Sequence, residues 1–123
     1  MSREYEHLNY RSLLDTQHLY VLDAQGEPQP VEDVIEWGQW MEEHNDARVI
    51  AHDRDEGGRN EILISTVFLG INMNPFGKGP PILFETMVFG GVLDQEIRRY
   101  ATRAEAYAGH QEMCRRVHES LMG

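Results

Sequence analysis

The hydrophobic pattern centres on two apolar runs, residues 61–72 and 82–93. Both runs are rich in Ile, Val, Leu, Phe and Thr, and neither repeats with the 3.6-residue period of a helix, which predicts strands. The nine residues between them contain three prolines and two glycines, which favour a turn. We therefore expect residues 61–71 and 82–89 to be adjacent antiparallel strands at the centre of the fold.

Three shorter segments extend the predicted strands. Residues 18–23 form a short strand candidate that ends in a turn containing glycine and proline. Residues 48–53 are expected to pair with the first central strand through a turn at residues 55–60, which holds two adjacent glycines. Residues 94–100 are expected to add a short edge strand.

Apolar residues at spacings of three and four predict two helices. The first, over residues 30–44, begins with Pro30 and has acidic residues in its first turn, which suits the positive end of the helix dipole. Its apolar stripe is Val31, Val34, Gly38 and Met41, flanked by Ile35 and Trp37. The second helix starts at a capping box, Thr102 to Glu105. Its stripe is Tyr107, His110, Cys114, Val117 and Leu121.

These elements predict an α+β domain with an antiparallel sheet of about four strands and two main helices packed on one face. The chain of 123 residues has the size of one domain. We assign residues 1–17 to an N-terminal arm or short helix and residues 18–123 to the single domain.

The expected location is the cytoplasm, without membrane contact. No apolar run approaches the roughly 20 residues that cross a bilayer, and the polar N-terminus lacks the apolar core of a secretory signal. A single cysteine excludes an intramolecular disulfide and fits a reducing compartment.

The acidic charge is concentrated in one third of the chain. The formal net charge is −10, and residues 23–61 alone contain 12 acidic and 3 basic residues. Phosphate contacts need clustered Lys and Arg, so direct nucleic-acid binding is disfavoured. An acidic face suits a basic protein surface instead, although acidic residues also keep a small domain soluble.

The acidic side of the first helix is the predicted partner-binding surface. Its residues are Glu32, Asp33, Glu36, Trp40, Glu43 and Asp46. Trp40 falls outside the apolar stripe, so it is either covered by another element or exposed as an anchor for a partner. The glutamates spread over about 16 Å of helix, which imitates only a few phosphates of duplex DNA. We expect partial nucleic-acid mimicry or a plain acidic contact.

Catalytic and metal chemistry are weakly represented. His110, Cys114 and His118 are spaced like a ligand row on one helix, but the two histidines are about 12 Å apart along its axis. Because Cys114 belongs to the apolar stripe, we expect it to be buried in the core, and we expect no bound metal or cofactor. His52 and Asp53 resemble part of an acid–base set, yet no nucleophile accompanies them, so we expect no catalytic residues.

The loop at residues 72–81 is the second candidate surface. It is longer than a hairpin needs, and loops carry binding functions more often than their share of residues. Its candidate residues, with neighbours on the following strands, are Asn72, Asn74, Phe76, Lys78, Glu85, Arg98 and Arg99. They support an alternative function, binding of a small ligand or nucleotide signal, with the cations taking phosphates, particularly across a homo-oligomer interface. A structural loop stiffened by prolines is the competing interpretation.

The segment ISTVFLGINMNPFGKGPPILFETMVFGG, with Tyr100 and residues 106–110 downstream, resembles a group of small uncharacterised proteins found in bacteriophages and prophages. The resemblance covers residues 18–118. In that group a strand ending in STVFLG leads through a glycine-rich loop into LFETMVFGG, and no activity is attached to the group. Residues 72–75 read NMNP here, where the group has an Asp-His pair, so any chemistry of that pair is absent.

The resemblance implies a non-enzymatic phage accessory protein. Small acidic phage proteins of this kind often occupy the surface of a host protein, including host defence complexes, in the manner of an anti-CRISPR inhibitor. We therefore expect an inhibitor that binds a host protein with a basic surface. The alternatives are the ligand-sequestering protein described above and a phage structural or assembly component.

Overall fold

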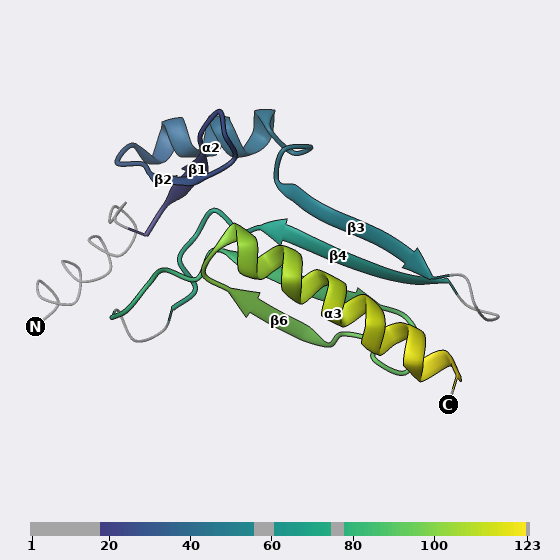
Figure 1. Ribbon diagram of the computed structural model, residues 1–123. Coiled ribbons are helices and arrows are strands. Elements are labelled where there is room, and N and C mark those ends of the chain that lie inside the picture. Colours follow the sequence, from purple (N-terminus) through teal and green to yellow (C-terminus); the bar gives the residue numbers. More distant parts are fainter. Residues whose placement is uncertain (1–17, 56–60, 75–77, 123) are drawn as a thin grey trace, which may run out of the picture.

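The computed structural model describes residues 18–55, 61–74 and 78–122. The predicted arm at residues 1–17, most of the predicted turn at 55–60, and Phe76 lie outside the described residues. The strands are β1 (Tyr20–Leu22), β2 (Pro28–Pro30), β3 (Val49–Asp55), β4 (Ile62–Phe68), β5 (Phe84–Phe89) and β6 (Ile97–Tyr100). The helices are α2 (Val34–Glu43) and α3 (Arg103–Met122) (Figure 1). Neither of these described helices combines the length and the apolar composition that a bilayer crossing requires.

Four strands form an antiparallel meander in the order β3–β4–β5–β6. The two apolar runs become β4 and β5, which are adjacent and antiparallel as predicted, with Thr66 opposite Thr86. In both strands every second residue is buried, which gives the sheet an inner face toward the core. The predicted edge strand is confirmed as β6, and the fold is α+β.

The helix α3 covers the inner face of this sheet (Figure 1). It contacts all four strands of the meander, and its buried residues are Ala106, His110, Met113 and Val117. The predicted stripe is wrong at Tyr107, which is 44% exposed. Cys114 and Leu121 are half-buried and pack against the core from its edge. The capping box is confirmed: Thr102 Oγ1 accepts from the Glu105 N–H, and Glu105 Oε1 accepts from the Thr102 N–H.

A β-bulge near the start of β3 decides which of its side chains reach the inner face. The register with β4 shifts between Val49 and Ala51. Ile50 is buried, and strict alternation from it would turn the even-numbered residues of β3 inward. Beyond the shift, the odd-numbered residues Asp53 and Asp55 instead lie opposite inward-facing residues of β4. The strand therefore turns two carboxylates toward α3.

The helix α2 begins four residues later than predicted. Residues 28–30 pair with β1 in a separate two-stranded sheet, so Pro30 belongs to a strand rather than to the first helical turn. Asp33 is the N-cap, and its side chain accepts from the backbone N–H groups of Ile35 and Glu36.

The face that α2 turns toward the protein is shifted from the predicted stripe: Gly38 and Met41 are half-buried as predicted, but Val34 is 40% exposed. Trp37 Nε1 donates to the carbonyl oxygen of Gly70 at 3.0 Å, and Trp40 lies edge-on to Phe68. Ile35, on the predicted apolar side, is 69% exposed. The two large indoles remove more apolar area from water than Ile35 would, which accounts for the rotation of the helix.

Candidate functional site

A groove of about 360 Å³ lies between β3 and α3. β3 contributes Asp53 and Asp55, and α3 contributes His110, Cys114 and His118. The three α3 residues are four positions apart, so they follow one side of the helix. The groove thus gathers carboxylates, imidazoles and the single thiol of the chain.

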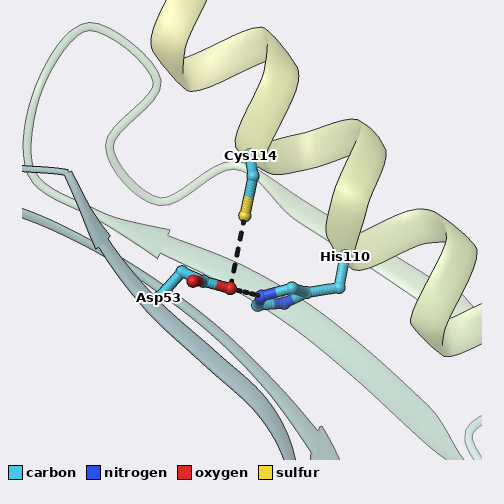
Figure 2. A group of neighbouring side chains, drawn as sticks. All are labelled: Asp53, His110 and Cys114. Atoms are coloured by element: carbon cyan, nitrogen blue, oxygen red, sulfur yellow. Dashed lines mark hydrogen bonds and ion pairs between the residues drawn. The ribbon is translucent and has the colours of Figure 1, made fainter.

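Asp53, His110 and Cys114 form the centre of this groove, and Figure 2 shows both α3 side chains directed at the carboxylate. Asp53 Oδ2 lies 2.7 Å from His110 Nε2 and 3.7 Å from Cys114 Sγ. One candidate ligand atom from each residue lies within 4.8 Å of the other two. The His110 side chain is 4% exposed and that of Asp53 is 60% exposed, so the cluster has a fixed inner wall and an open side.

A chain of hydroxyl groups hydrogen-bonds His110 on the side of the ring away from Asp53. Thr66 Oγ1 lies 2.7 Å from His110 Nδ1 and also hydrogen-bonds Thr86 Oγ1. The Tyr100 hydroxyl lies 3.0 Å from Thr86 Oγ1 on the other side. Both threonines are fully buried. Each ring nitrogen of His110 therefore has a partner, and the imidazole is fixed in orientation.

Cys114 lies at the edge of the groove, half-buried, so the prediction that it is buried in the core is wrong. Its surroundings nevertheless keep the thiol protonated. Burial, followed by the charge of Asp53 and its hydrogen bond to the thiol, raises the pKa of Cys114 from 9.0 to about 11, and Asp55 adds to the rise.

Cys114 is expected to react slowly with a small alkylating reagent near neutral pH. A thiol pKa of about 11 in place of 9.0 lowers the thiolate fraction about 100-fold, and only the thiolate attacks. The measurement compares alkylation rates of the native and urea-unfolded protein. Asp53→Asn should accelerate the native reaction, and Glu36→Gln on α2 should not. Equal rates in native and unfolded protein would contradict this account of the thiol.

Two kinds of chemistry fit this geometry poorly. A nucleophilic cysteine needs a lowered pKa, whereas burial and, after it, the two aspartates raise the pKa of Cys114. Carboxylate, imidazole and hydroxyl follow one another as in a hydrolytic triad, from Asp53 through His110 to Thr66. That hydroxyl is fully buried and bonded to Thr86, so no substrate can reach it.

A divalent transition-metal ion fits the cluster better. A tetrahedral Zn²⁺ with bonds of about 2.0–2.3 Å separates its ligand atoms by about 3.3–3.8 Å. The contact from Cys114 Sγ to Asp53 Oδ2 already has this length, at 3.7 Å. The contact from Asp53 to His110 would have to lengthen by less than about 1 Å, which the exposed Asp53 side chain can do by rotating outward.

The second half of the groove lies one helical turn further along α3. His118 Nδ1 is 3.4 Å from Asp55 Oδ2, and the His118 side chain is 65% exposed. These residues line the groove but are outside the three-residue cluster. Asp55 adds negative charge beside the cluster, which favours a bound cation.

The predicted partner surface is only partly available. Glu32, Glu36, Glu43 and Asp46 are exposed. Asp33 caps α2. Trp40 is half-buried, stacked on His44 and edge-on to Phe68, so it is covered by other elements rather than exposed as an anchor.

The polar residues of the predicted loop site stabilise the loop itself. Asn72 Oδ1 accepts from the backbone N–H groups of Asn74 and Ile82. Asn74 Nδ2 donates to the carbonyl oxygens of Lys78 and Pro80. The amides therefore join the described residues on the two sides of this loop, while Lys78 is exposed.

The predicted ligand cations do not converge. Arg99 pairs with Glu85, with Nε and Oε2 3.0 Å apart, on the outer face of the sheet. Arg98 is opposite Thr86, whose side chain is on the inner face. Neighbouring residues of a strand point to opposite faces, so these two arginines cannot bind one phosphate within a single chain.

The combination of Asp53 with His110 and Cys114 was missed from the sequence. The i, i+4 spacing of the two α3 residues was visible, but Asp53 lies 57 residues before His110 in the chain, and its inward direction depends on the bulge. No family model, no curated protein and no solved structure matches this chain.

Proposed function

We propose that this protein binds one Zn²⁺ ion through Asp53, His110 and Cys114. The observation that supports this is the cluster itself: carboxylate, imidazole and thiol atoms from two elements, all within 4.8 Å of one another. Thiolate and imidazole are ligands that favour Zn²⁺ over Mg²⁺ or Ca²⁺. Three protein ligands leave a fourth position for water or an exchangeable ligand, as in zinc sites that are not purely structural.

The electrostatics of the groove favour the same ion. Asp53 and Asp55 oppose ionisation of Cys114 in the metal-free protein, and a bound dication reverses that effect by stabilising the thiolate. Binding should therefore release the thiol proton to the buffer.

Replacing Asp53 by Asn should weaken ion binding by about 100-fold or more, because the carboxylate ligand itself is lost. Loss of a residue that only hydrogen-bonds to a ligand typically weakens metal affinity by about 10–100-fold. Titration of the metal-free protein with Co²⁺ measures this, since thiolate ligation gives a charge-transfer band. The matched control is Asp55→Asn, two residues along the same strand, with an expected loss below about tenfold. A native protein that binds no Co²⁺ or Zn²⁺ would rule out the proposal.

A second candidate function is binding of a basic partner protein through the exposed acidic side of α2, such as the host protein that the phage resemblance implies. The observation in its favour is that Ile35 is 69% exposed beside Glu32 and Glu36. An apolar residue surrounded by acids suits an interface with an apolar contact inside a charged rim.

Reversing Glu32, Glu36 and Glu43 to Lys should abolish binding to such a partner. Like charges placed together at an interface cost several kcal/mol, whereas exposed substitutions change stability by about 0.5 kcal/mol or less each. Capture from host lysate followed by mass spectrometry identifies the partner, and urea unfolding checks stability. The control reverses Glu112 on α3, far from α2 in the chain. A partner captured equally well by the triple variant would exclude this surface.

A further inference from the structure

We propose that an ion on His110 reverses the hydrogen-bond chain running from His110 through Thr66 and Thr86 to Tyr100. Occupancy of the groove between β3 and α3 would then change the state of a hydroxyl group on β6, at the opposite edge of the sheet. This inference rests on the proposed binding of Zn²⁺ and adds a way in which that site is coupled to the rest of the fold.

Without an ion, Asp53 fixes the direction of the chain. An ionised carboxylate only accepts hydrogen bonds, so His110 Nε2 carries the proton that it donates across 2.7 Å. In the neutral ring Nδ1 is then an acceptor, and Thr66 must donate to it. Thr66 Oγ1 in turn accepts from Thr86, which accepts from the Tyr100 hydroxyl. Every donor points toward Asp53.

With an ion on Nε2, the only ring proton moves to Nδ1. Nδ1 becomes the donor, so Thr66 accepts from His110 and must turn its own proton toward Thr86. Thr86 then turns its proton toward the Tyr100 oxygen, which changes from donor to acceptor. The freed Tyr100 proton points toward solvent or into the small cavity that Tyr100 shares with Glu112.

Burial makes this reversal cooperative. Thr66 and Thr86 are fully buried, so neither hydroxyl can direct its proton to water, and an unpaired buried donor is costly. The strand register places the two threonines directly opposite each other, which keeps the oxygens in contact whichever of them donates. Only protons need to move along the chain, and the heavy atoms can stay in place.

The test is imidazole nitrogen NMR on the full chain labelled with ¹⁵N-histidine, recorded before and after addition of Zn²⁺. The expected result is that His110 changes from the Nε2–H form to the Nδ1–H form at one equivalent of ion. Binding of Zn²⁺ without a change of tautomer would overturn the reversal and leave the proposed function intact. No binding of Zn²⁺ would overturn both. An Nδ1–H form in the metal-free protein would overturn the assigned direction by itself.

Variants separate this coupling from simple structural support. Thr66→Ser keeps the hydroxyl and should retain near-native Zn²⁺ affinity, even if it lowers stability. Thr66→Val removes the hydroxyl and should lower affinity about 10–100-fold. Ser65→Ala, the adjacent hydroxyl on the opposite face of β4, is the control and should change nothing.

Tyr100→Phe tests the far end of the chain. In the loaded state it leaves the Thr86 proton without an acceptor, so Zn²⁺ affinity should fall by about tenfold although Tyr100 does not touch the ion. A Tyr100→Phe variant that folds and binds Zn²⁺ with native affinity and native His110 tautomers would show that the hydrogen-bond chain ends before β6.

Discussion

Replacing His110 by alanine is expected to lower the free energy of unfolding of the metal-free protein by about 2–4 kcal/mol and to abolish ion binding. The imidazole is 4% exposed and bridges Asp53 to Thr66. Its removal leaves a cavity beside α3 and a buried hydroxyl with one partner fewer. Urea unfolding measures the loss of stability, and Co²⁺ titration measures the loss of binding.

The ion adds a second difference between native protein and the His110→Ala variant. At free Zn²⁺ about 100-fold above its dissociation constant, the native fold should gain about 2.7 kcal/mol, and the variant should gain nothing. His118→Ala is the matched control on the same helix, because this side chain is 65% exposed and lies outside the cluster. It should change stability by no more than about 0.5 kcal/mol. A His110→Ala variant as stable as native would contradict the assigned packing.

Replacing Gly109 by alanine is expected to destabilise the protein, although alanine is the better helix former by about 1 kcal/mol. A Cβ atom at this position would lie 2.1 Å from the Tyr100 ring, so the ring must move and its hydrogen bond to Thr86 is strained or lost. Overpacking of this kind costs about 1–3 kcal/mol or more, which outweighs the gain in propensity.

Two controls separate the clash from the helix propensity. At Gly38 in α2 an added Cβ would meet no atom within 4 Å other than the backbone of its own helix and chain neighbours, so Gly38→Ala should stabilise the protein by about 0.5–1 kcal/mol. In a Tyr100→Ala background the Gly109→Ala change should also become stabilising, because the ring is gone. Thermal unfolding of the four variants measures these differences. Destabilisation by Gly109→Ala that persists without Tyr100 would show that another contact is responsible.

Patterns confined to one element predicted much of this fold. The apolar runs gave β4 and β5, and the capping box from Thr102 to Glu105 marked the start of α3. Such signals depend on neighbours in sequence, which also lie close together in space. Which side of each helix is buried was harder to predict from the sequence, because it depends on tertiary contacts. Trp40 is covered by Phe68, and Tyr107 is left exposed.

The candidate site could not be assembled from the sequence for the same physical reason. His110 and Cys114 are neighbours on α3 and were visible as a pair. Asp53 joins them only because β3 is positioned beside α3 by its pairing with β4, and because the bulge turns its odd-numbered residues inward. Thr66 and Thr86 lie in apolar strands. In such a strand the sequence indicates only that a threonine, as a β-branched residue, favours β-structure, and it does not show that its hydroxyl is hydrogen-bonded in the core.

Because of the bulge in β3, one-residue deletions at two nearby positions would direct Asp53 and Asp55 to opposite faces of the sheet. Deleting Ile50 would restore regular pairing and leave Asp53 and Asp55 facing α3, at the expense of one core side chain. Deleting His52 would reset the alternation after the bulge, so that Arg54 faced the helix and both aspartates faced solvent. The groove would then attract anions instead of cations. The charge that this groove presents is therefore set by the spacing of residues along one strand as much as by their identity.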